Sequence, residues 1–358
     1  MRKINLFLSV VSVLILSGFQ NLYAEASPNA DYSVLVLGDL HFDGMEYHAT
    51  PATTSNRAKE RKRNCGMWEK ATPELLTLAA KHADKNVPFV VQVGDFTQGD
   101  CDTFELHEKM IADGFAKVKS FFPEHKLLPV RGNHDVRMLK NNSGTPTVKA
   151  YFPRIAKELG VEKITGTYSV RHGKDLYIFF DGFVSKKQLL VELKKAFAEN
   201  SDARHTFFIT HLPVLNCATG NPAWLVPSFK AVRDLLLERN AIIITAHTHV
   251  PSLLQVERNG KKLTQVVVST VGSNWKPEAK MEVHLSGYDN YLKQIGEKKL
   301  SSAKLKPSFD DMKTYTVPLF EIYRNGTGFC MLKIAGDNVT IEFYTNASGK
   351  PSMVKVLR

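Results

Sequence analysis

The chain has 358 residues, of which 43% are hydrophobic and 23% are charged. This is an ordinary globular composition, and it excludes the low-complexity, fibrous and intrinsically disordered classes. The formal net charge is +11, but the basic residues are mostly scattered and no nucleic-acid-binding motif accompanies them. We therefore expect one large globular domain or two smaller ones, and the sequence offers no specific signal of nucleic-acid binding.

The N-terminus is typical of a secretory signal peptide. Two basic residues precede an apolar stretch at 4–19, and small residues offer a cleavage site after Ala24 or Ala26. A retained membrane anchor is the alternative, although the stretch is slightly short of the roughly 20 apolar residues that a span needs. No later segment is apolar enough to cross a membrane. We expect residues 1–26 to be removed and the mature protein to be secreted or periplasmic.

The part that follows alternates buried strands with amphipathic helices. Apolar runs predict strands at 33–37, 88–93, 127–130, 206–210 and 241–245, and a pair of strands is expected at 167–172 and 176–180. Helical patterns lie at 72–83, 103–122, 148–159, 186–199 and 227–239. Residues 42–71 are expected to form a long loop. The alternation indicates the α/β class, with strands that are covered on both faces.

The region after residue 250 is richer in strands. Predicted strands lie at 252–257 and 263–269, joined by an Asn-Gly hairpin signal, and at 319–324, 329–334 and 339–344. Residues 276–312 are polar and expected to be irregular, with a short helix near 289–294. A second domain is one interpretation of this region. We prefer a single domain at 31–358, in which the hairpins extend a second sheet.

Four cysteines bear on the redox environment. An even number in an exported chain predicts two disulfides, for which three connectivities exist. Cys65 and Cys101 fall in loops that we expect on the same rim of the fold. A Cys65–Cys101 disulfide is therefore favoured, which leaves Cys217 to pair with Cys330.

The densest basic run lies at 57–63, with the sequence Arg-Ala-Lys-Glu-Arg-Lys-Arg. Such a run can steer an anionic substrate toward a site. The alternative is a solvated, mobile loop within the expected long loop, and we prefer this second interpretation.

Five of the predicted strands end in side chains that can bind a metal. In chain order these residues are Asp39 with His41, Asp95, Asn133 with His134, His211, and His247 with His249. In α/β folds, ligands bind at the carboxyl ends of the strands, so these residues would meet at one edge. Carboxylate, amide and imidazole groups without thiolates suit Zn, Mn or Fe. His247-X-His249 is moderately specific and the other motifs are weak alone, but the five together predict a metal site.

These blocks resemble those of the calcineurin-like metallophosphoesterases. The resemblance covers about residues 33–250, through Gly38-Asp39-Leu40-His41, Gly94-Asp95, Gly132-Asn133-His134-Asp135, Thr210-His211 and His247-Thr248-His249. It implies a four-layer α/β/β/α sandwich over this core, followed by a β-rich part at 251–358. It also implies two metal ions, with Fe, Mn or Zn as candidates, and a small phosphorylated substrate.

The resemblance also assigns roles to the residues. Asp39, His41 and His249 would bind the first metal, Asn133, His211 and His247 would bind the second, and Asp95 would bridge both. His134 and Asp135 would be catalytic, with His134 over the substrate phosphate and Asp135 fixing its ring. The implied reaction is in-line attack on phosphorus by a hydroxide that bridges the metals.

Three departures from the family pattern bear on the subfamily. Ala246 stands where the family usually has Gly, which is tolerable if φ is negative there. Phe96-Thr97 provides no tyrosinate ligand, so a coloured iron centre is not implied. The segment 94–98 looks more similar to a phosphodiesterase branch. Phosphomonoesterase, cyclic-nucleotide phosphodiesterase and other diesterase activities stay open, and a non-catalytic metal-binding scaffold on the same fold is the alternative from another class.

Overall fold

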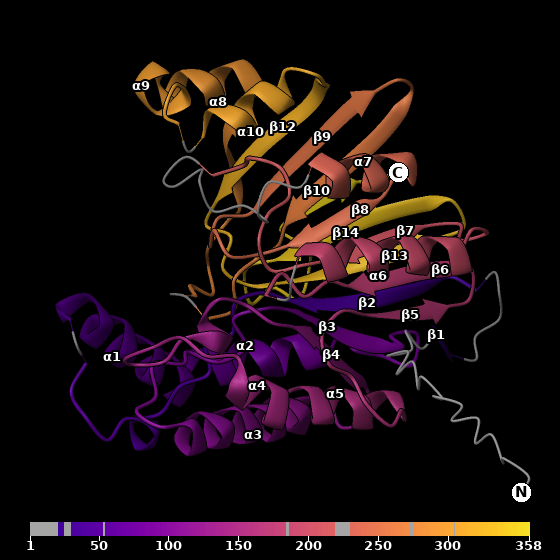
Figure 1. Ribbon diagram of the computed structural model, residues 1–358. Helices are drawn as coiled ribbons and strands as arrows, with labels where there is room; N and C mark the ends of the chain where they lie inside the picture. The colour runs from indigo at the N-terminus through magenta and orange to yellow at the C-terminus, as the bar shows by residue number, and fades with distance from the viewer. Residues whose placement is uncertain are drawn as a thin grey trace, which may run out of the picture.

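The structure, a computed structural model (Figure 1), describes residues 21–24, 30–52, 54–183, 186–218, 230–272, 275–303 and 305–358. Its described strands form two sheets. Across sheet A the order is β1 (Asn21–Ala24), β5 (Tyr168–His172), β6 (Asp175–Phe179), β7 (Thr206–Ile209), β8 (Ile242–Thr245), β10 (Lys261–Val267), β9 (Ser252–Arg258), β12 (Thr316–Arg324) and β11 (Glu282–Ser286). Across sheet B it is β15 (Met353–Val356), β14 (Asn338–Tyr344), β13 (Phe329–Ala335), β2 (Tyr32–Leu37), β3 (Phe89–Val93) and β4 (Lys126–Val130).

Helices cover the outer faces of the sheets. They are α1 (Ser55–Glu69), α2 (Ala71–Ala80), α3 (Phe104–Phe121), α4 (Thr145–Ala150), α5 (Phe152–Leu159), α6 (Lys186–Glu199), α7 (Lys230–Glu238), α8 (Tyr288–Ile295), α9 (Glu297–Leu300) and α10 (Lys306–Met312). Helix α5 packs against β4, and α7 packs against β10. Figure 1 shows α3 and α5 along the lower side of the molecule and α8 to α10 at the top. The two sheets with their outer helices give the predicted four-layer sandwich.

The central strands β7 and β8 of sheet A are buried on both faces. Phe207 and Ile244 belong to the core between the sheets, whereas Phe208 and Ile243 belong to a second core that includes residues of α6 and α7. Consecutive residues of a strand point to opposite faces, so a strand with two buried faces needs an unbroken apolar run. This confirms the interpretation of the continuous apolar runs as buried strands.

The β-rich C-terminal part contributes to both sheets. Strands β9 and β10 continue sheet A beside β8, while β13 pairs with β2 in the antiparallel direction. Figure 1 shows the yellow strands β13 and β14 in the same region as the indigo strand β2. Residues 276–312 are more regular than expected, because they contain β11, α8, α9 and α10.

Residues 42–71, expected to be a long loop, contain the 15-residue helix α1. The basic run 57–63 lies inside this helix, so its preferred interpretation as a mobile loop is wrong. The helix begins after Thr54, whose side chain accepts a hydrogen bond from the backbone nitrogen of Arg57 at 3.2 Å. Its buried residues are Arg61, Asn64, Cys65 and Trp68. Because this buried face is largely polar, no apolar helical pattern marks it in the sequence.

The predicted disulfides Cys65–Cys101 and Cys217–Cys330 are wrong, because all four cysteines carry free thiols and are buried. Each thiol has its own packing environment: Cys65 lies on α1, the Sγ atom of Cys101 is 3.9 Å from the Sδ atom of Met110, and Cys330 lies in β13. Burial raises the pKa of Cys65 and of Cys330 to about 12.

Most of the predicted signal peptide lies outside the described residues, which omit 1–20 and 25–29. Between these segments, β1 pairs in parallel with β5. Cleavage after Ala24 or Ala26 would remove β1 and leave β5 at the edge of sheet A. In the part of the chain that the structure describes, no helix has the length and apolar character needed to span a membrane.

Candidate metal centre

The five predicted strand ends meet where the carboxyl edges of the two sheets face each other. Strands β2, β3 and β4 are parallel neighbours in sheet B, and β7 and β8 are parallel neighbours in sheet A. The Nδ1 atom of His211 donates to the carbonyl of Val93 at 2.9 Å, and the backbone nitrogen of Gly272 donates to the carbonyl of Asp39 at 2.7 Å. These bonds join the two edges.

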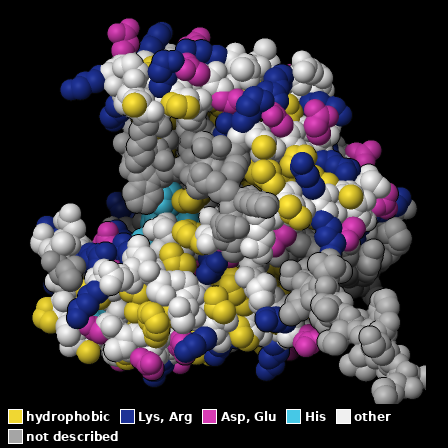
Figure 2. All heavy atoms as spheres, viewed as in Figure 1, with side chains coloured by type: hydrophobic (Ala, Val, Ile, Leu, Met, Phe, Trp, Pro, Cys, Tyr) yellow, Lys and Arg dark blue, Asp and Glu magenta, His cyan; other side chains and the backbone are white. Residues whose placement is uncertain are grey.

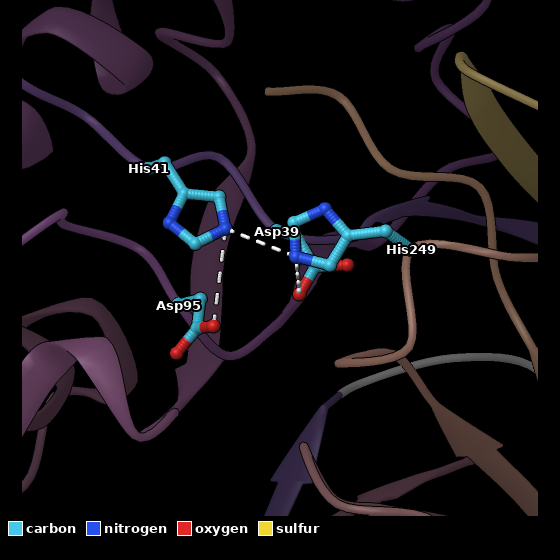
Figure 3. A group of neighbouring side chains, drawn as sticks. All are labelled: Asp39, His41, Asp95 and His249. Atoms are coloured by element: carbon cyan, nitrogen blue, oxygen red, sulfur yellow. Dashed lines mark hydrogen bonds and ion pairs between the residues drawn. The ribbon is translucent and has the colours of Figure 1, made fainter. Parts of the chain in front are cut away.

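The first ligand group consists of Asp39, His41, Asp95 and His249, whose ligand atoms lie within 4.8 Å of one another. The Nε2 atoms of His41 and His249 are 3.3 Å apart. His41 Nε2 is 3.9 Å from Asp95 Oδ2, and His249 Nε2 is 3.9 Å from Asp39 Oδ1. Figure 3 shows these nitrogen and carboxylate atoms turned toward one another. The group offers two nitrogen and two oxygen donors to one cation.

The second ligand group consists of Asp95, His211 and His247. The Nε2 atom of His211 is 3.2 Å from Asp95 Oδ2, 3.0 Å from His247 Nδ1 and 3.1 Å from Asn133 Oδ1. Asn133 therefore adds an amide oxygen beside the three titratable side chains. Asp95 belongs to both groups, which is the position that the resemblance gives to the bridging ligand.

The carboxylates of the centre have fixed hydrogen-bond partners. Asp39 accepts from the backbone nitrogen of His247 at 3.1 Å and from the Thr270 hydroxyl at 3.1 Å. Asp95 accepts from the backbone nitrogen of His134 at 2.8 Å. Such outer partners orient metal ligands. Thr270 was missed from the sequence, because it lies beyond the matched blocks and no motif marks it.

Two glycines allow these side chains to approach the backbone. A Cβ atom on Gly132 would lie 2.1 Å from the backbone nitrogen and from the Oδ1 atom of Asp95. Gly94 has a φ of +80°, and a Cβ atom there would lie 2.5 Å from His211 Nδ1. Any larger residue at either position would push a ligand away. Ala246 is not among the described residues with positive φ, which meets the condition for tolerating its methyl group.

The backbone is strained at the ligand residues themselves. Asp39, His41, Asp95, His247 and His249 have φ values of 27°, 44°, 50°, 70° and 55°. Non-glycine residues rarely adopt positive φ, and each such residue costs about 1–3 kcal/mol. Strain of this kind persists where the surrounding structure enforces it, and it clusters at functional sites.

The electrostatics of the centre favour a positive charge beside Asp95. Burial alone would lower the pKa of His211, but the carboxylates of Asp95 and Asp39 raise it to about 9. Burial and the positive charge of His211 lower the pKa of His247 to about 3. The charged form of His211 is thus favoured, while the ring of His247 stays neutral and keeps a lone pair on nitrogen. Cations held by nitrogen and oxygen ligands fit both demands.

His134 lies beside the two groups. Its Nε2 atom is 4.0 Å from Asp95 Oδ2, and its ring packs edge-on against the ring of His41 with centroids 4.5 Å apart. Its Nδ1 atom is 3.0 Å from the carbonyl oxygen of Gln98. Because a carbonyl oxygen can only accept, Nδ1 carries a proton, and Nε2 is the atom that faces the centre.

Asp135 does not fix the ring of His134, and this predicted role is wrong. Its buried carboxylate accepts hydrogen bonds from the backbone nitrogens of Gly132 at 2.7 Å and Thr97 at 2.8 Å. Burial and the nearby charge of Asp95 raise its pKa to about 6. Asp135 instead ties the loop after β4 to the loop after β3, so it supports ligands in both loops.

Helix α1 also supports the centre, which the sequence did not reveal. The indole nitrogen of Trp68 donates to the carbonyls of Leu40 at 3.0 Å and His41 at 3.1 Å. The amide of Asn64 donates to the Gln98 side chain at 2.5 Å. Figure 2 shows histidine side chains at a hollow in the surface, with Lys and Arg side chains nearby. The basic helix therefore forms part of the wall around the centre.

A model of the family described as calcineurin-like phosphoesterase matches residues 32–251. A search of curated protein sequences finds no match. Among solved structures, GAP50, the anchor in the inner membrane complex of Plasmodium, has a TM-score of 0.51 and 12% identity, with 92% of this chain and 89% of that chain covered. The purple acid phosphatase PPD1 from yellow lupin has a TM-score of 0.55 and 11% identity, with 93% and 55% covered. PhoD has a TM-score of 0.53 and 10% identity, with 92% and 70% covered. These structures share the fold.

Proposed function

Because the chain belongs to the calcineurin-like phosphoesterase family, we propose that it is a secreted or periplasmic hydrolase of small phosphate esters that works with two metal ions. The observation that carries this proposal is the sharing of Asp95 between two ligand groups. A shared carboxylate between two nitrogen-rich groups is what a two-metal phosphoesterase needs.

The residues that would hold the metals follow from the two groups. Asp39, His41 and His249 would bind one cation, Asn133, His211 and His247 would bind the other, and Asp95 would contact both. Two cations at such a site activate water and neutralise negative charge on the phosphoryl oxygens. The donor set admits Zn, Mn or Fe without choosing among them.

His134 is the side chain that we assign to the substrate. Burial lowers the pKa of its ring to about 4, and a bound phosphate would supply the negative charge that favours the protonated ring. Nε2 would then donate to a phosphoryl oxygen or to the leaving-group oxygen, because Nδ1 is already occupied by the carbonyl of Gln98.

Export is proposed from the leader-like residues 1–26 alone. Expression of the full chain in a bacterial host, followed by N-terminal sequencing of the protein from each cell fraction, tests it. A mature N-terminus after Ala24 or Ala26 in the periplasm or medium supports export. An intact N-terminus in the cytoplasm overturns it.

Metal content and ester preference test the activity. Purified protein should contain about two transition-metal ions per chain. It should hydrolyse p-nitrophenyl phosphate or its bis ester, lose turnover on chelation, and regain it on addition of Zn, Mn or Fe. The ratio of the two rates separates monoesterase from diesterase. Bound metal without hydrolysis of any phosphate ester would favour the scaffold alternative, in keeping with the fold likeness to GAP50, which is described as an anchor.

A further inference from the structure

Four side chains of α1 and of the loop after β3 form a hydrogen-bonded row. Arg63 Nε donates to Asn64 Oδ1 at 3.1 Å, Asn64 Nδ2 donates to Gln98 Oε1 at 2.5 Å, and Gln98 Nε2 reaches Glu60 Oε2 at 3.4 Å. Asn64 and Gln98 are each 1% exposed. A buried amide pair of this kind is costly unless its hydrogen bonds are satisfied.

The ends of the row fix the direction of both amides. A guanidinium can only donate, so Arg63 holds the oxygen of Asn64 and leaves its NH₂ group for Gln98. A carboxylate can only accept, so Glu60 favours the NH₂ group of Gln98 on its side. Reversing either amide would place two acceptors or two donors opposite each other. The row therefore defines one orientation of the Gln98 side chain.

The backbone of Gln98 links the hydrogen-bonded row to the metal centre. Its carbonyl oxygen is the partner of His134 Nδ1 at 3.0 Å. The adjacent segments are also tied, because the backbone nitrogen of Asp100 donates to the carbonyl of Arg137 at 2.8 Å, and Arg137 binds both Glu60 and Asp100. A helix outside the matched strand ends thus supports the one atom that sets the tautomer of His134.

We propose that Asn64 and Gln98 are positioning residues for His134: the row from α1 holds the Gln98 carbonyl where it fixes the Nδ1–H tautomer and directs Nε2 at the metal centre. The effect on turnover rests on the proposed phosphoesterase function, whereas the effect on the tautomer does not. Since Asn64 touches no ligand of either group, its action on the reaction would pass through His134.

A double-mutant cycle tests the effect on turnover. Asn64→Leu, which keeps the approximate size of the side chain, should lower kcat by about 10- to 100-fold, the range for a misplaced catalytic group, with KM nearly unchanged. In a His134→Ala background the same substitution should change kcat by less than about 2-fold, because the side chain through which Asn64 acts is absent. Equal losses in both backgrounds, or loss of bound metal, would overturn the proposal.

Two further variants separate positioning from general damage. Gln98→Met keeps the backbone carbonyl but breaks the row, and it should reproduce the kcat loss even if Asn64→Leu folds poorly. Glu69→Ala alters an exposed residue of the same helix and should leave kcat and the thermal midpoint unchanged. A Glu69→Ala loss as large as that of Gln98→Met would mean that any change in α1 disturbs the site, against the specific role.

The tautomer can be read without any turnover. Long-range proton–nitrogen NMR spectra of the histidine rings, with His134 assigned by its absence in His134→Ala, should show the Nδ1–H form in the wild type and a mixture in Asn64→Leu and Gln98→Met. An unchanged His134 signal in both variants would overturn the positioning role. Failure of the wild type to hydrolyse any ester would overturn the proposed function, and this NMR comparison would still decide the role of the row.

Discussion

The two ends of the sandwich hold buried polar clusters of opposite character. At the amino ends of β2 and β6, the Tyr32 hydroxyl donates to Asp175 Oδ2 at 2.9 Å and Arg204 Nε donates to Asp175 Oδ1 at 3.0 Å. A second nitrogen of the Arg204 guanidinium and, at 3.2 Å, the backbone nitrogen of His205 also donate to this carboxylate. Each oxygen of this carboxylate meets a donor, and its charge is matched by one guanidinium. The cluster joins sheet A to sheet B, and its hydrogen bonds and charges are matched by its own residues, without a bound ion.

The carboxyl ends of the same sheets are arranged differently. There the imidazole nitrogens of His41 and His249 face each other at 3.3 Å, and those of His211 and His247 at 3.0 Å. The facing nitrogens of His41 and His249 cannot satisfy each other while both are unprotonated, and the backbone has positive φ at five ligand positions: Asp39, His41, Asp95, His247 and His249. Excess acceptors on a strained backbone indicate binding, whereas a matched and relaxed cluster indicates structure.

Replacing Asp95 is the strongest way to break the carboxyl-end cluster. Asp95→Asn removes the charge shared by both ligand groups. We expect a greater loss of metal affinity and turnover than the 10- to 100-fold that loss of an outer partner costs. Elemental analysis and ester hydrolysis measure it. Asp202→Asn, whose carboxylate is 77% exposed, is the control. Wild-type metal content and turnover in Asp95→Asn would contradict the assignment of the centre.

Breaking the amino-end cluster should lower the stability of the fold and leave turnover unchanged. Asp175→Ala leaves the mostly buried Arg204 without its partner, which should cost about 3–5 kcal/mol in the free energy of unfolding. Turnover per folded molecule should stay at the wild-type value. Urea unfolding gives the first quantity and activity below the transition gives the second. The exposed pair of Arg324 with Glu282 is the comparison, and Glu282→Ala should cost less than about 1 kcal/mol.

Much of the fold is predictable because buried strands carry a strong local signal. The run at 33–37 is apolar after Ser33, and together with Tyr32 it forms β2. Helix α1 has no comparable signal, since its buried face contains Arg61 and Asn64, which pair with loops that only the folded chain brings near. Polar burial depends on tertiary partners, so sequence periodicity does not detect it.

The ligands of the centre are predictable for a related reason: each lies at the end of such a strand, and parallel neighbours align their ends. The residues that support these ligands are not predictable from the sequence. Asp135 stands next to His134 in the sequence, yet its carboxylate binds the loop after β3. The partner of the His134 ring is a backbone carbonyl, and any residue type can supply one. Side-chain direction at a tight turn is set by the surrounding loops, and the sequence does not record it.

A buried imidazole away from both clusters gives the smallest and most separable effect. His107 on α3 is fully buried, and its Nδ1 atom is 3.1 Å from the Sδ atom of Met138. Its Nε2 atom has no hydrogen-bond partner in the described part of the chain. Burial, with no carboxylate to offset it, lowers the pKa of His107 to about 4. His107 carries an imidazole, as several ligands of the centre do. Its backbone is unstrained, as it is in the amino-end cluster.

The sign of its effect on stability follows from proton uptake. The unfolded chain protonates this histidine near its ordinary pKa of about 6.5, whereas the folded protein resists protonation until about pH 4. Stability from this residue is therefore complete above pH 6.5 and is lost as the pH falls to 4, by up to about 3 kcal/mol.

His107→Leu should remove that part of the acid destabilisation, as urea midpoints from pH 7 to pH 4 would show. His284→Leu, at an exposed position of β11, should leave the pH dependence as it is. An unchanged slope in His107→Leu would mean that this imidazole is not kept neutral by burial, and that acid unfolding begins at the carboxylates of the two clusters.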